Sequence, residues 1–230
     1  MKRFHFLFYL LLLLLACQAT DGPVSVASAP GSSGSALAAQ GRACEPSPAT
    51  RSDAKKVLFV GNSLTYTNDL PSLVAGIGAR KGVLIEKEML AFANYALEDH
   101  WNEGCIQKLI MSGYYDFVVV QQGPSSQADG RKMLLEYGAL IQELCVQHDT
   151  KLAFFMVWPA RVNYQTFDGM IRNYTDAALT TGSLLCPAGW AWKQYIDRTG
   201  DFSHYGPDDL HPSLSGSQVA AEVIYKALFP

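Results

Sequence analysis

The chain has no run of basic residues and no arginine-rich helix. Its 230 residues include 18 Lys and Arg and 21 Asp and Glu, a formal net charge of −3. Binding to the phosphates of nucleic acid requires clustered cations, so nucleic acid is not expected as a partner.

The motifs of common cofactor and metal sites are absent as well. No Gly-x-Gly-x-x-Gly or Gly-Lys-Ser/Thr loop follows the first apolar run of the domain, which argues against a phosphate-binding sheet. The cysteines and histidines do not have the spacing of zinc ligands. We therefore expect neither a metal nor an organic cofactor. No internal repeat is visible.

Long apolar runs are also missing, because the longest one, residues 6–15, is too short for a permanent membrane span. Two basic residues precede it and small residues follow it, which is typical of an export signal covering residues 1–16. The run ends Leu-Leu-Ala-Cys17, which resembles the lipobox of bacterial lipoproteins and implies lipid on the Cys17 thiol. An ordinary signal peptide with a chance cysteine is the alternative.

The lipobox resemblance implies an exported protein held in the bacterial cell envelope. Gln18 after the cysteine suggests anchoring in the outer membrane, facing the periplasm or the cell surface. Cleavage before Cys17 leaves 16 basic and 21 acidic residues, a charge of −5. Residues 17–53 are rich in Ala, Ser, Gly and Pro and are expected to form a flexible linker. Residues 54–230 suit one globular domain with one core.

Four cysteines remain after the lipobox. In an oxidising compartment one or two disulfides can form, but spacing does not determine the pairing. Two of the cysteines fall within a helical and a strand-like pattern, so buried free thiols are the alternative. The four are Cys44, Cys105, Cys145 and Cys186.

Apolar runs that predict strands alternate with helical patterns along the domain. We expect strands at 57–60, 83–90, 116–120, 152–157 and 184–186. We expect helices at 70–80, 97–112, 133–147, 167–179, 190–197 and 215–228. This order predicts a single three-layer α/β/α domain with a parallel, flavodoxin-like five-stranded sheet. Functional residues are then expected beyond the carboxyl ends of the strands.

Residues suited to acyl transfer follow these strand ends. Ser63 comes directly after the first strand, and Asp208 and His211 precede the last helix. Taken singly, Ser63 could cap a helix, Asp208 could form a turn and His211 could be a solvated loop residue. Their conjunction in one domain favours a catalytic site.

Both end segments resemble the SGNH (GDSL-like) hydrolase superfamily. Gly61-Asn62-Ser63 is similar to the family's nucleophile block, and Asp208-x-x-His211-Pro212 to its last block. The resemblance covers about residues 55–230 and implies a serine esterase. The resemblance implies that Ser63 is the nucleophile and His211 the general base. Asp208 would orient the imidazole, and Asp209 is the alternative residue for this role.

The middle of the sequence departs from the family pattern. Residues 91–96 contain no glycine, so a backbone N–H at or near Asn94 is expected to bind the oxyanion. Ser125 stands where the family has an asparagine, and Ser125 or Gln122 is the further candidate donor. The altered blocks leave open a non-catalytic envelope binding module on the same fold.

The expected substrate is a short-chain acyl ester, an O-acetyl group on a carbohydrate being favoured. No long apolar loop suggests a lipid tunnel, although a lysophospholipase or thioesterase remains an alternative. Trp158 and three other aromatic residues are candidates to contact a sugar ring; core packing is the alternative for all four and is favoured for Trp101. Those three are Tyr95, Trp101 and Tyr205.

Overall fold

The computed structural model describes residues 44–230. The predicted signal peptide, Cys17 and most of the predicted linker lie outside the described residues. Five parallel strands form one sheet in the order β2-β1-β3-β4-β5, which confirms the predicted flavodoxin-like sheet. The strands are β1 (Lys55–Gly61), β2 (Ile85–Ala91), β3 (Phe117–Val120), β4 (Lys151–Phe155) and β5 (Leu184–Cys186).

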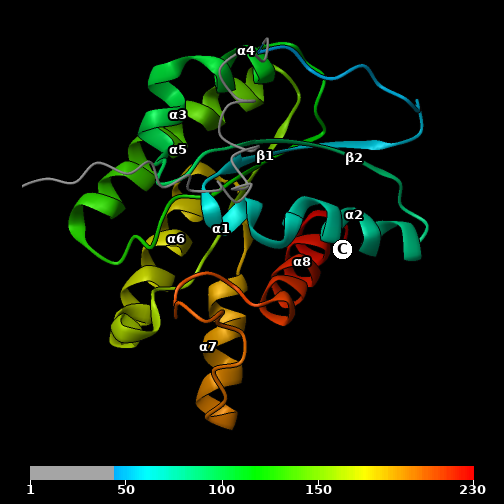
Figure 1. The fold of residues 1–230 in the computed structure, drawn as a ribbon. Helices are drawn as coiled ribbons and strands as arrows, with labels where there is room; N and C mark the ends of the chain where they lie inside the picture. Colours follow the sequence, from blue (N-terminus) through cyan, green and yellow to red (C-terminus); the bar gives the residue numbers. More distant parts are fainter. Residues whose placement is uncertain (1–43) are drawn as a thin grey trace, which may run out of the picture. The chain divides into compact units, whose positions relative to one another are not determined.

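Helices cover both faces of the sheet. They are α1 (Ser63–Tyr66), α2 (Leu70–Arg80), α3 (Leu97–Glu103), α4 (Cys105–Met111), α5 (Ala128–Gln147), α6 (Phe167–Thr181), α7 (Ala188–Thr199) and α8 (Leu214–Leu228). Two 3-10 helices, η2 (Thr67–Asp69) and η3 (Arg161–Thr166), join them. Figure 1 shows α2 and α8 packed together on one side of the sheet and α5 and α6 on the other. The predicted three layers are therefore present.

The central strands are buried because both faces of the sheet are covered. All four residues of β3 are buried, and so are the last five of β1. Such strands read as continuous apolar runs, which is why the sequence predicts them. Chain connections leave β1 and β3 in opposite directions, and ligand sites in folds of this kind lie at that point.

Some element boundaries differ from the predicted ones. The helix expected at 97–112 is two helices, because Gly104 has φ 77° and ends α3 before α4 begins. Helix α5 begins at Ala128, five residues before the predicted start, because its first turn carries little of the apolar pattern. Within residues 44–230 no helix has both the length and the apolar character needed to cross a membrane.

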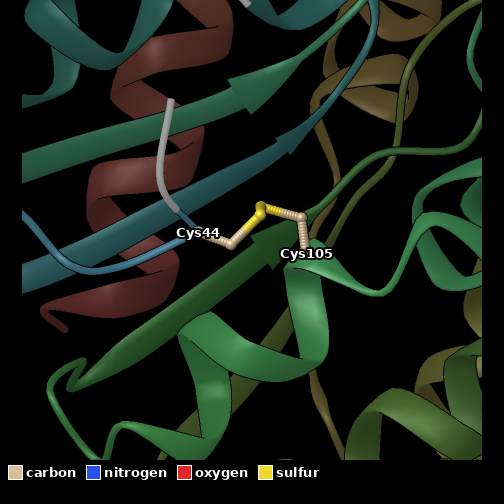
Figure 2. Close-up of a disulfide and its surroundings, with 2 residues drawn as sticks. All are labelled: Cys44 and Cys105. Carbon is tan, nitrogen blue, oxygen red and sulfur yellow. A yellow bond between two sulfur atoms is a disulfide. The ribbon is translucent and has the colours of Figure 1, made fainter. Parts of the chain in front are cut away.

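The start of the described chain is fastened to the domain. Cys44 forms a disulfide with Cys105, the first residue of α4 (Figure 2). The backbone N–H of Ser47 donates to the carboxylate of Glu88, and those of Thr50 and Arg51 donate to the carboxylate of Glu86, both on β2. This part of the predicted linker therefore makes specific contacts with the sheet.

Cys145 and Cys186 are the two free thiols of the described chain. Both are fully buried, on α5 and β5. Burial raises the pKa of each thiol to about 12, so the reactive thiolate is not populated near neutral pH. These two cysteines act as core residues, the alternative that the sequence left open.

Candidate active site

Ser63 lies in a sharp turn between β1 and α1. Strand β1 ends at Gly61, Asn62 is extended with φ −131°, and Ser63 is the first residue of α1. Asn62 caps this helix, since its Oδ1 accepts the N–H of Leu64 at 3.1 Å. The capping role that was the alternative for Ser63 is therefore taken by its neighbour.

The hydroxyl and the backbone N–H of Ser63 are not engaged by other groups of the described chain. The residue is partly exposed, and neither its hydroxyl nor its backbone N–H has a hydrogen-bond partner among residues 44–230. The N–H at the start of a helix has no intrahelical acceptor and carries part of the positive end of the helix dipole. A hydroxyl and a free N–H thus lie on one residue at a strand end.

Asp208 and His211 form a hydrogen-bonded pair in the loop before α8. His211 Nδ1 lies 2.6 Å from Asp208 Oδ2, and Asp208 Oδ1 accepts the backbone N–H groups of Leu210 and His211 at 3.1 and 2.9 Å. The His211 side-chain bond and these N–H groups lower the pKa of Asp208 to about 2. A carboxylate acceptor selects the Nδ1–H tautomer and leaves Nε2 with a lone pair. His211 can therefore accept a proton through Nε2.

Asn68 joins the nucleophile segment to the segment that carries the imidazole. Its Nδ2 donates to the carbonyl oxygen of Pro212 at 3.1 Å and to Ser217 Oγ at 3.0 Å. A residue five positions after Ser63 thus binds the residue directly after His211. No hydrogen bond between Ser63 Oγ and His211 Nε2 occurs within residues 44–230. Catalytic hydrogen bonds without substrate are often long and tighten in the Michaelis complex.

Asp209, the alternative to Asp208, faces a different partner. Its backbone is left-handed, with φ 57°, and its Oδ1 forms an ion pair with Arg161 Nη1 at 3.2 Å. The Arg161 backbone N–H also donates to the Asp209 carbonyl at 2.8 Å. The Asp209 carboxylate therefore contacts the segment after β4 and not the imidazole.

The predicted oxyanion donors differ in what their groups contact. Asn94 is exposed with φ 64°, a conformation that glycine favours and asparagine tolerates, and its N–H has no acceptor among residues 44–230. The Gln122 carboxamide accepts the Leu97 N–H at 2.8 Å, and the Ser125 hydroxyl donates to the Gly123 carbonyl at 2.8 Å. Both of these side chains are nearly fully buried. The backbone of Asn94 is the more available donor of the three.

Trp158 does not offer a face to a ligand. Its side chain is fully buried and stacks on Trp192 with ring centroids 3.5 Å apart. Its indole N–H donates to the carbonyl of Leu210, the residue just before His211, at 3.0 Å. The predicted sugar contact conflicts with this burial, and the ring instead supports the Asp208–His211 loop. Tyr205, another predicted aromatic contact, is buried as well.

Two buried polar residues beside the nucleophile turn were not singled out from the sequence. Gln121, at the end of β3, accepts the N–H of Asn62 and the hydroxyl of Thr65, both at 2.9 Å. His100 on α3 lies 2.8 Å through Nε2 from the carbonyl of Gly61. Gly61 is required here because a Cβ would lie 2.5 Å from Gln121 Oε1. The only sequence signal was the position of Gln121 directly after an apolar strand.

No known family profile matches the sequence, and no curated protein matches it. The described residues contain no cluster of three or more His, Cys, Asp or Glu able to hold a metal ion. Solved structures do match the fold. A protein from Slackia heliotrinireducens described as an SGNH hydrolase gives a TM-score of 0.66 at 24% identity, over 76% of this chain and 99% of that one.

Two esterases of known structure are also similar. The acetylxylan esterase Axe2 from Geobacillus stearothermophilus gives a TM-score of 0.51 at 17% identity, covering 76% of this chain and 94% of its own. The psychrotrophic esterase EstA from Pseudoalteromonas sp. gives 0.56 at 12% identity, with coverages of 76% and 96%. The parallel sheet, its strand order and these matches together show that the chain has the fold of the SGNH hydrolases.

Proposed function

We propose that this chain is a serine esterase in which Ser63, His211 and Asp208 form the catalytic triad. The observation that carries the proposal is the Asp208–His211 pair, which leaves Nε2 as a base in a loop bonded to the nucleophile segment through Asn68. The free hydroxyl of Ser63 at the end of β1 supports it, as does the fold shared with esterases.

In the proposed reaction, His211 Nε2 takes the proton of the Ser63 hydroxyl as its oxygen attacks the ester carbonyl. The tetrahedral oxyanion receives hydrogen bonds from the N–H groups of Ser63 and Asn94. Collapse breaks the bond to the alcohol, which leaves with the proton from His211. Water then attacks the acyl-enzyme by the same route and releases the acid. Asp208 stabilises the imidazolium in both halves.

The favoured substrate is a short acyl ester, and O-acetyl on a carbohydrate is the specific proposal. The structural similarity to the acetylxylan esterase Axe2 supports this choice. The carbohydrate cannot stack on Trp158, whose ring is buried. A panel of p-nitrophenyl esters from acetyl to decanoyl measures the acyl preference. Preference for decanoyl would instead favour the lysophospholipase or thioesterase reading.

The decisive experiment labels the protein with a fluorophosphonate probe. Only an activated serine reacts quickly, so wild-type protein is expected to be labelled and Ser63→Ala unlabelled, with unchanged circular dichroism. Ser72→Ala is a matched control, because Ser72 lies on α2 with its hydroxyl bound to Asp69. An unlabelled wild-type protein would indicate the non-catalytic binding module.

We also propose that the protein is an envelope lipoprotein anchored through Cys17. The Cys44–Cys105 disulfide supports export, since such bonds persist in oxidising compartments. Metabolic labelling with a clickable fatty acid is expected to mark the wild-type protein and not Cys17→Ser. A wild-type protein without label would instead favour an ordinary signal peptide.

A further inference from the structure

The peptide unit that precedes Ser63 is held at both of its polar atoms by buried side chains. The carbonyl oxygen of Gly61 accepts from His100 Nε2 at 2.8 Å, and the N–H of Asn62 donates to Gln121 Oε1 at 2.9 Å. A carbonyl only accepts, so His100 carries its proton on Nε2. These two atoms belong to one peptide plane, which is therefore fixed in rotation from both sides.

Both side chains reach this peptide from other elements. His100 comes from α3 and is 1% exposed, while Gln121 follows β3 and is 0% exposed. The rings of Phe92 and Tyr95 pack on the imidazole with centroids 5.9 and 5.1 Å away. Gln121 is itself held, since its Nε2 donates to the Gln122 carbonyl at 2.7 Å. Neither group is free to turn away from the peptide.

His100 is a polar side chain in a buried, apolar position, which calls for a hydrogen bond that an apolar side chain could not make. Its Nδ1 is buried without a hydrogen-bond partner among residues 44–230. Burying an unpaired polar atom costs free energy, whereas a leucine would fill the same apolar surroundings without that cost. Within the described part of the chain, the bond to the Gly61 carbonyl is the one hydrogen bond that the imidazole makes.

We propose that His100 and Gln121 form a peptide clamp that positions the nucleophile. The clamp consists of these two side chains and the Gly61–Asn62 peptide. By fixing this peptide plane, it sets the direction in which the Ser63 hydroxyl and the Ser63 N–H point. His100 and Gln121 are positioning residues, because both are buried and act on Ser63 through the backbone before it. The inference rests on the proposed function, in which both Ser63 groups act on the ester.

The test compares variants that keep or remove each contact. His100→Gln keeps an N–H donor, whereas His100→Leu removes it. Gln121→Met removes the acceptor and is the second route if His100→Leu does not fold. His148→Leu is the control, since this histidine lies before β4, at the amino ends of the strands. Each variant is measured for p-nitrophenyl acetate hydrolysis, fluorophosphonate labelling rate and melting temperature.

Removal of the donor is expected to lower kcat and the labelling rate by about 10²-fold, because small misplacements of reacting groups have effects of this size. KM and the melting temperature are expected to stay near wild type, and His100→Gln is expected to recover most of the rate. The clamp is overturned if folded His100→Leu keeps wild-type rates, or if His100→Gln loses as much as His100→Leu.

Hydrogen–deuterium exchange of the peptide spanning residues 57–66 separates this proposal from the esterase proposal. If wild-type protein is not labelled, the proposed function fails, and exchange alone then tests the clamp. Faster exchange of the 57–66 peptide in His100→Leu, but not in His100→Gln, supports the clamp. Unchanged exchange in both variants overturns it.

Discussion

At the level of single residues, Asp208 and Asp209 are adjacent carboxylates with different partners. Asp208 binds the His211 imidazole, and Asp209 binds Arg161. We expect Asp208→Asn to lower kcat/KM by about 10⁴-fold, because the imidazole then loses the acceptor that selects its tautomer. Asp209→Asn is expected to change it by less than about tenfold, since only a surface ion pair is lost. A larger loss of kcat/KM in Asp209→Asn than in Asp208→Asn would assign the aspartate of the triad to Asp209.

The titration of Asp208 provides a second prediction at this scale. Its folded-state pKa, about 2, lies below the ordinary 3.8, chiefly because of the hydrogen bond from His211. The ionised Asp208 carboxylate therefore stabilises the folded state fully above the unfolded pKa of 3.8, and this contribution is lost as the pH falls through about 2. Replacing His211 with Ala is expected to raise the Asp208 pKa toward 3.8, measured by ¹³C NMR of its carboxyl carbon. An unchanged midpoint would show that the backbone N–H groups alone hold it.

Which residues could be predicted depends on how local their interactions are. Asp208 and His211 are three positions apart, so their pairing follows from a short pattern. The contacts of Gln121 and His100 join segments 59 and 39 residues distant from the nucleophile turn. No local pattern carries such information. Trp158 was misinterpreted because an aromatic residue at a strand end can be a ligand contact or a core residue, and burial is decided by the whole fold.

At the level of elements, two glycines of α2 make a matched test of packing. A Cβ on Gly78 would lie 2.7 Å from the carbonyl oxygen of Val83, so Gly78→Ala is expected to destabilise by about 1–3 kcal/mol. A Cβ on Gly76 would meet only the Arg80 side chain, at 3.7 Å, so Gly76→Ala is expected to stabilise by about 0.5–1 kcal/mol. Urea unfolding of both variants measures the difference. Equal shifts would contradict the close approach of α2 to the chain before β2.

The prediction of elements succeeded where burial imposes a pattern. The predicted positions of all five strands overlap the observed ones, and the central strands stand out because buried parallel strands are continuous apolar runs. This reason does not extend to β2, which is mostly only partly buried and carries three charged residues. Helix α1 was missed because four residues are too few to show a period. The break between α3 and α4 was missed because one glycine within an apolar periodicity is also compatible with an unbroken helix.

At the level of the whole molecule, the Cys44–Cys105 bond closes a loop with a sequence separation of 61 residues. In the chain-entropy account, such a loop stabilises the folded state by roughly 4 kcal/mol. We expect dithiothreitol to lower the melting temperature of the wild-type protein and to leave that of a Cys44→Ser/Cys105→Ser variant unchanged. An equally large drop in the melting temperature of both proteins would place the reducible bond elsewhere. The sequence could not predict this pairing, because it depends on where the chain before β1 returns to the sheet.

The same disulfide decides how a mechanical pull would travel through the protein. A force applied upstream of Cys44 and resisted at the carboxyl end passes across the sulfur–sulfur bond to α4. The intervening chain, with β1, Ser63 and β2, is bypassed by this covalent path. Tension on the N-terminal segment is thus diverted from the nucleophile strand for as long as the bond remains oxidised.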